Sequence, residues 1–135
     1  MSEELKIVAS EQKVRSYRDL IVWQKGMELV KAVYTTTRTF PEEEKFGLTS
    51  QLRRSVISVP SNISEGQARQ STKEFIQFLY IAKGSLAELD TQIILARVLA
   101  YVKDDIYQSL QKKVSELQRM FSRLIEKLEK GPATL

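Results

Sequence analysis

Residues 75–100 read FIQFLYIAKGSLAELDTQIILARVLA, and this stretch decides the expected fold. Apolar side chains recur in it at alternating steps of four and three, which places them on one face of a helix. These side chains are Phe75, Leu79, Ala82, Leu86, Leu89, Ile93, Ala96 and Ala100. Ser71 and Glu74 form a capping-box pattern just ahead of the stretch. We therefore predict a helix of roughly 30 residues, about 45 Å long.

Apolar stripes of the same spacing lie on both sides of this helix. Those expected to face the core are Leu20, Trp23, Met27, Val30 and Tyr34 in the first segment, Leu48, Leu52, Val56, Val59 and Ile63 in the second, and Tyr107, Leu110, Val114, Leu117, Phe121, Leu124 and Leu128 in the last. The glutamates at 42–44 suit the positive N-terminal end of the second helix. Asp104 or Asp105 is expected to cap the last helix, which Gly131-Pro132 ends.

Four amphipathic segments with short connections favour an all-α fold, an antiparallel up-and-down four-helix bundle, because short loops make neighbouring helices run in opposite directions. We place this domain at residues 17–130. Residues 1–16 are polar with little periodicity and form the expected flexible leader, and residues 131–135 form a short C-terminal tail. An alternative strand at VISV has no second alternating segment to pair with.

The composition excludes several classes of function. The chain has 135 residues and neither His nor Cys, which removes imidazole bases, thiolate nucleophiles and the usual zinc ligands. We expect no enzyme activity, no cofactor and no metal, although a carboxylate-only site using Mg or Mn ions stays open as an alternative. No apolar window approaches the roughly 20 residues of a membrane span, so we expect a cytoplasmic protein without a membrane partner.

Two helices carry more apolar surface than one bundle requires. Segment 71–100 has a second seam formed by Tyr80, Gly84, Ala87, Thr91, Leu95 and Val98, and the first helix has one formed by Val22, Gly26, Leu29 and Val33. A helix in a lone bundle needs one such face, so the extra seams predict self-association. The alternative is a wide core stripe that packs unequally among four helices.

Residues 53–66, RRSVISVPSNISEG, place a proline inside the second helix. Pro60 cannot donate to the carbonyl of Val56, so we expect a kink there. The apolar stripe stays in phase across it, which favours a continuous helix over a break capped by Asn62. Arg54, Ile57, Ser61 and Glu65 fall on the opposite face, a mixture typical of an interface.

Two sets of candidate site residues follow. The candidate nucleic-acid contacts are Arg53, Arg54, Arg69 and Lys73, and the candidate oligomer contacts are Ile57, Ser61, Glu65, Tyr80, Leu95 and Val98. Guanidinium groups match phosphate oxygens. The alternative for the adjacent arginines is an ion pair with an acid such as Glu65, Glu88 or Asp90. The net charge of +4 is scattered, so nucleic-acid binding requires the fold to gather it.

Four motifs in order carry a family resemblance: WQK at 23–25, GLTSQLRR at 47–54, VPSNISEG at 59–66 and GSLAEL at 84–89. Over about residues 17–128 the chain resembles the bacterial four-helix-bundle proteins of the 23S rRNA intervening-sequence family. The resemblance implies a small bundle protein that assembles into a ring-like homopentamer, of a kind sometimes encoded within insertions in large-subunit rRNA genes. Arg53 and Arg54 match the family's arginine pair, and Pro60, Asn62, Glu65 and Gly66 match its proline segment.

The same resemblance extends to accessory proteins of diversity-generating retroelements, which are thought to engage a reverse transcriptase and nucleic acid. The family name records a gene location and no activity. We predict a non-enzymatic homo-oligomer whose assembled surface binds RNA, another nucleic acid or a nucleic-acid enzyme. The alternative is a structural scaffold without nucleic-acid affinity, and salt dependence of binding separates the two.

Overall fold

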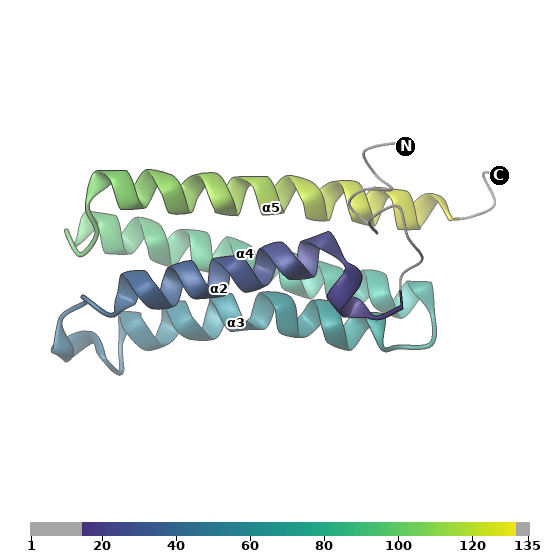
Figure 1. The fold of residues 1–135 in the computed structure, drawn as a ribbon, viewed down its shortest axis with the longest axis horizontal. Helices are drawn as coiled ribbons and strands as arrows, with labels where there is room; N and C mark the ends of the chain where they lie inside the picture. Colours follow the sequence, from purple (N-terminus) through teal and green to yellow (C-terminus); the bar gives the residue numbers. More distant parts are fainter. Residues whose placement is uncertain (1–14, 132–135) are drawn as a thin grey trace.

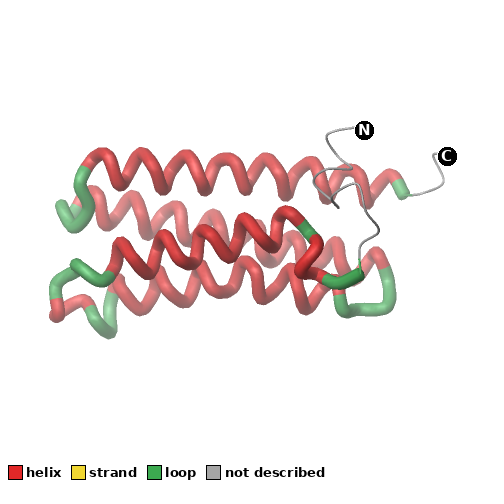
Figure 2. Tube along the Cα trace, viewed as in Figure 1, coloured by secondary structure: helices red, strands yellow, loops and turns green. Residues whose placement is uncertain are grey.

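The computed structural model describes residues 15–131, and four long helices account for most of them (Figures 1 and 2). They are α2 (Ile21–Thr37), α3 (Leu48–Gln67), α4 (Thr72–Val98) and α5 (Asp104–Lys130), with short 3₁₀ helices η1 (Tyr17–Asp19) and η2 (Glu42–Glu44). The described part contains no strand. The all-α, four-helix prediction is confirmed, while most of the predicted leader and tail lies outside the described residues.

The helices lie side by side, and their connections alternate between the two ends of the bundle (Figure 1). Consecutive helices therefore run in opposite directions. Each helix contacts two neighbours, in the cyclic order α2, α3, α4, α5, while the diagonal pairs α2–α4 and α3–α5 do not approach each other. α4 thus occupies the corner diagonally opposite α2.

The core consists largely of the stripes predicted for α3, α4 and α5. The prediction for Ala100, the last residue of the α4 stripe, is wrong, because this residue lies exposed beyond the end of α4 with φ of 62°. Val56, Leu86 and Phe121 are completely buried, and Tyr107 and Leu128 pack partly buried against the core. Burying a large apolar side chain contributes roughly 1.5–3 kcal/mol, so these stripes are the main source of stability.

The prediction for α2 selected the wrong face. Its buried residues are Val22, Gly26, Leu29, Val33 and Thr37, which include the whole expected second seam. Met27 is 45% exposed, while Trp23, Val30 and Tyr34 are half-buried on the side that faces α3. Both stripes have helical spacing and lie about a quarter turn apart, so only the position of α2 at a corner of the bundle decides which one is buried.

α3 continues without a break through Pro60. The alternative break at Asn62 is wrong, because the Asn62 side-chain amide donates to the carbonyl and the hydroxyl of Ser58 at 2.8 and 2.9 Å. Pro60 is buried against Gly26, where a Cβ would lie 3.5 Å from the proline ring, so α2 and α3 pack closely here. The size of the kink stays a prediction.

The helix ends differ in part from the expected caps. The Ser71 hydroxyl accepts from the Glu74 N–H at 3.1 Å, as predicted. The predicted aspartate cap of α5 is wrong: Lys103 is the N-cap and makes no capping bond, while Asp104 lies in the first turn near Arg97, at 3.6 Å. Gly131, with φ of 70°, ends α5.

Candidate interaction surfaces

Arg53 is held inside the α2–α3 interface. Its Nε donates to the Thr37 hydroxyl at 2.9 Å, and its guanidinium carbon lies 4.5 Å from the centre of the Tyr34 ring. A guanidinium stacked on a ring and hydrogen-bonded in this way ties the two helices together. Its role toward nucleic acid stays a prediction.

The acids proposed as alternative partners for the two arginines have other contacts. Glu65 pairs with Arg69 at 3.1 Å, the Ser55 hydroxyl donates to Glu88 at 3.1 Å, and the Gln111 amide donates to Asp90 at 2.7 Å. Within residues 15–131, neither Arg53 nor Arg54 forms an ion pair with an acid of its own chain, and an ion pair with a second copy stays a prediction.

The other candidate nucleic-acid residues do not form one cluster. Arg54 is exposed midway along α3, whereas Arg69 follows its C-terminus and Lys73 is exposed in the first turn of α4. Arg54 lies thirteen helical rises, roughly 20 Å, before the end of α3 at Gln67, and Arg69 lies beyond that end. Arg69 is also 4.9 Å from the Phe78 ring centre, so it has a packing role.

The outer face of α4 is apolar and uncovered. Ten large hydrophobic side chains are strongly exposed in residues 15–131, and six of them, Tyr80, Ile81, Ile94, Leu95, Val98 and Leu99, lie on α4 or at its C-cap. Tyr80 donates to Glu129 at 3.4 Å, and the charge of Glu129 raises the pKa of Tyr80 above its ordinary value of 10.0. The predicted oligomer contacts Tyr80, Leu95 and Val98 therefore share one surface.

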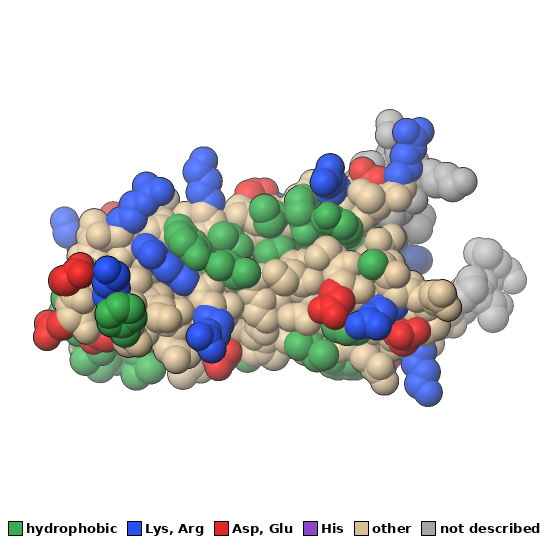
Figure 3. All heavy atoms as spheres, turned by 90° about the horizontal axis from the view of Figure 1, so that it is seen from below, with side chains coloured by type: hydrophobic (Ala, Val, Ile, Leu, Met, Phe, Trp, Pro, Cys, Tyr) green, Lys and Arg blue, Asp and Glu red, His purple; other side chains and the backbone are tan. Residues whose placement is uncertain are grey.

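A second apolar surface is the groove between α2 and α3, along which hydrophobic side chains gather in Figure 3. Its volume is about 220 Å³, and its lining residues are Trp23, Met27, Val30, Ile57, Pro60, Ser61 and Ser64. Ile57 and Ser61 were predicted as interface residues, whereas Trp23 and Met27 were expected in the core. Glu65 is exposed one turn beyond Ser61.

Basic side chains gather on α5, where the sequence reasoning placed no site residue. Residues 106–125 contain Lys112, Lys113, Arg119 and Arg123 against the single acid Glu116, four minus one or +3. Glu116 pairs with Lys25 of α2 at 3.5 Å. The sequence feature that could have indicated this site is the net charge of +2 over residues 103–135. Asp104 and Asp105 in the first turn of α5 lower that net charge and so hide the basic stretch behind them.

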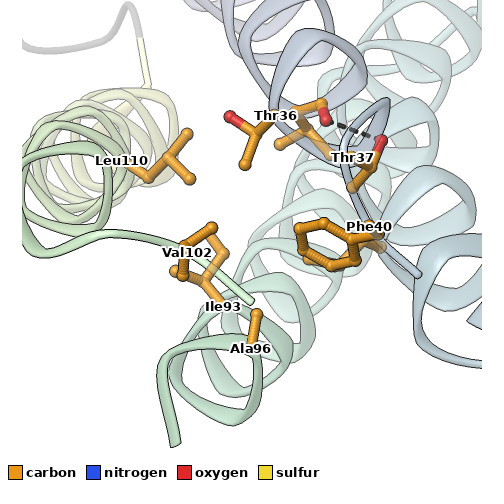
Figure 4. Close-up of a pocket in the computed structure, with 9 residues that line it drawn as sticks. Thr36, Thr37, Phe40, Ile93, Ala96, Val102 and Leu110 are labelled. Atoms are coloured by element: carbon orange, nitrogen blue, oxygen red, sulfur yellow. Dashed lines mark hydrogen bonds between the residues drawn. The ribbon is translucent and has the colours of Figure 1, made fainter. Parts of the chain in front are cut away.

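A small cavity lies in the interior at the end of the bundle where α2 meets Phe40 and Val102 (Figure 4). Its volume is about 10 Å³, close to the minimum for one water. The hydroxyls of Thr36 and Thr37 in its wall donate to the carbonyls of Ala32 and Val33, each at 2.9 Å. This cavity is a packing space that no substrate fits.

Residues 15–131 contain no group of three or more His, Cys, Asp or Glu residues placed to hold a metal ion. None of their helices combines the length and the apolar character needed to cross a bilayer.

The architecture is that of a four-helix bundle with apolar surface on two sides. The chain belongs to the 23S rRNA-intervening sequence protein family, whose model matches residues 18–123. A crystal structure of a protein of unknown function from the S23 ribosomal protein family of Bacteroides thetaiotaomicron VPI-5482 is similar, with a TM-score of 0.71 and 26% identity, covering 78% of this chain and 98% of that one. No curated protein matches significantly.

Proposed function

We propose that this chain is a non-enzymatic, self-associating helical bundle whose assembled surface binds RNA. The observation that carries the proposal is the uncovered apolar face of α4. Monomeric proteins rarely expose a contiguous apolar patch of more than a few hundred Å², and larger patches mark interaction sites. Five copies in a ring, which the family resemblance implies, is the assembly we expect.

Gly84 supports a partner on this face. It lies on the same side of α4 as Leu95 and Val98, and a Cβ built on it would have no neighbouring atom within 4 Å. An interior helical glycine costs about 1 kcal/mol relative to alanine, and nothing within the described chain offsets that cost. A second helix packed closely on α4 would offset it.

The basic side chains of α5 support RNA as the ligand; we call Lys112, Lys113, Arg119 and Arg123 the basic stripe of α5. Lys112 and Arg119 are exposed and seven residues apart, which is about 10 Å along one side of the helix. Assembly repeats this stripe in every copy, so several weak phosphate contacts act together. The predicted contact Arg54 is exposed on α3, which is a different helix. The same binding experiment compares its contribution with that of the α5 side chains.

Self-association is tested first, by measuring mass in solution with light scattering. Leu95 is 46% exposed, so Leu95→Glu leaves the fold intact and places a charge in the proposed contact. We expect a helical monomer where the unmodified chain is an oligomer. Ile106→Glu, at a side chain 40% exposed on α5, is the matched control and keeps the oligomer. A monomeric unmodified chain would overturn the proposal.

RNA binding is then measured across salt concentrations. Each neutralised phosphate contributes about 0.7–0.9 to the log–log slope of affinity against salt, so Lys112→Ala/Arg119→Ala should weaken binding and lower the slope by about 1.5. Arg53→Ala/Arg54→Ala, measured alongside, tests the predicted pair. An oligomer that retains no RNA at low salt supports the scaffold alternative and rejects this part of the proposal.

A further inference from the structure

The chain exposes two apolar surfaces of different shape on different sides of the bundle. We call the outward side chains Ile94, Leu95, Val98 and Leu99 the α4 ridge, and the hollow lined by Trp23, Met27, Val30, Ile57, Pro60, Ser61 and Ser64 the α2–α3 groove. We infer that the groove of one copy receives the ridge of a second copy. The inference rests on the proposed self-association and specifies the two surfaces that meet.

The groove has the shape and chemistry of a helix-binding site. Trp23 and Met27 form one wall and Ile57 the other, while Pro60 forms the floor. Gly26 lies beneath this floor, and a Cβ built on it would be in ordinary van der Waals contact with the ring of Pro60, at 3.5 Å. None of its lining residues is ionisable. Binding a helix there buries apolar area without desolvating a charge, and Met27 adapts its shape to the guest.

The ridge matches the groove in length. Residues 94–99 span five helical rises, about 7.5 Å, and each groove wall spans seven, about 10 Å, from Trp23 to Val30 and from Ile57 to Ser64. Val98, the last residue of α4, is the most exposed ridge residue at 73%. The one charged residue in this stretch, Arg97, lies 3.6 Å from Asp104 of its own chain, so it introduces no unpaired charge.

The arrangement of the two surfaces favours a head-to-tail contact between copies. α2 and α4 occupy diagonal corners of the bundle, so a copy is unable to cover its own groove with its own ridge. A two-fold contact pairs one patch with itself and leaves the other patch exposed. A head-to-tail contact covers both, because every copy supplies one ridge and one groove, and it builds a ring or a chain of copies.

Two complementary variants test the pairing. Met27→Glu disables the groove and keeps the ridge, and Leu95→Glu disables the ridge and keeps the groove; both side chains are surface-exposed, so both variants fold. We expect each variant alone to be a monomer. An equimolar mixture should form a 1:1 heterodimer and nothing larger, because one functional ridge and one functional groove remain. Native mass spectrometry measures these masses, with Ile106→Glu as the control.

A cross-linking measurement keeps both surfaces nearly intact. The chain has no cysteine, so Ile57→Cys and Val98→Cys each introduce a single thiol. We expect mild oxidation of the co-assembled variants to give the mixed disulfide dimer, and oxidation of either variant alone to give none. A disulfide formed by one variant alone, without the mixed dimer, contradicts the pairing.

The outcomes separate this inference from the proposed function. If the unmodified chain is a monomer, the proposed function fails. If it assembles and Leu95→Glu is monomeric while Met27→Glu still assembles, only the groove assignment fails. If both variants are monomeric and their mixture forms neither a heterodimer nor the mixed disulfide, the two surfaces bind separate partners and the inference is overturned.

Discussion

Gly66 and Gly84 are both helical glycines, but their surroundings are opposite. A Cβ on Gly66 would lie 2.5 Å from the Cβ of Phe78 and 3.2 Å from the Phe75 ring, so α3 and α4 approach each other here as closely as a residue without a side chain permits. A Cβ on Gly84 would meet nothing. Glycine therefore permits close packing of α3 against α4 at position 66, whereas at position 84 no part of the described chain packs against it.

These surroundings predict opposite effects of alanine. Gly66→Ala should lower the free energy of unfolding by about 1–3 kcal/mol, because a methyl group has to be forced between packed helices. Gly84→Ala should raise it by up to about 1 kcal/mol, because alanine has the higher helix propensity. Urea unfolding of both variants in the Leu95→Glu background measures the effects without assembly. Equal effects of the two substitutions would contradict the packing at Gly66.

At the scale of the element, α3 and α5 begin in different ways. The Glu44 carboxylate, from the preceding 3₁₀ turn, accepts the Leu48 N–H at 3.0 Å and so caps α3. α5 has no such partner, since Lys103 makes no side-chain cap and places a positive charge at the positive end of the helix. The backbone of Lys103 itself is extended, with φ of −75° and ψ of 158°, which is the conformation of a typical N-cap residue.

A capping side chain at position 103 should therefore stabilise the protein. We expect Lys103→Asp to raise the free energy of unfolding by about 1 kcal/mol, since the carboxylate accepts a free N–H of the first turn and interacts favourably with the helix dipole. Thermal unfolding of the variant gives the change. Lys103→Ala is the control for loss of the lysine alone, and a variant no more stable than this control would count against the cap.

At the scale of the whole molecule, two connections far apart in sequence meet at one end of the bundle. The Tyr101 hydroxyl donates to Glu44 at 2.8 Å, and the rings of Phe40 and Tyr101 lie 5.4 Å apart. The hydrogen bond from the Leu48 N–H, with that from Tyr101, lowers the pKa of Glu44 below its ordinary value of 4.5. The bond to Glu44 in turn raises the pKa of Tyr101 above 10.0.

The shifted pKa of Glu44 sets an acid dependence of stability. A lowered folded-state pKa contributes stability above pH 4.5, and this contribution disappears as the pH falls through the lower folded value. Glu44→Gln should therefore be less stable than the unmodified chain at pH 7, with the difference shrinking below pH 4.5. Urea unfolding across pH measures it, and Glu43→Gln, exposed in the same turn, is the control. A difference that is constant with pH would refute the linkage.

Much of the fold was predictable because it depends on local patterns. The stripes of α3, α4 and α5 have helical spacing, so most of their buried apolar residues were identified correctly, although Ala100 is exposed and the buried Met120 and Ile125 of α5 were not predicted. α2 has two apolar stripes, and local spacing does not say which faces the core. Arg53 shows the same limit: its adjacency to Arg54 suggested a shared role, but Thr37 and Tyr34, which hold it, come from another helix.

The sequence by itself determined four helices, their approximate ends, a continuous α3 and the absence of His and Cys chemistry, because these depend on composition and on residues close in the chain. Tertiary structure decided which face of α2 is buried, that Gly26 meets Pro60, and that a groove forms beside Trp23 and Met27. It also brought Tyr101 to Glu44. These features depend on how helices pack at a corner of the bundle, which is a relation between segments distant in sequence that no local period encodes.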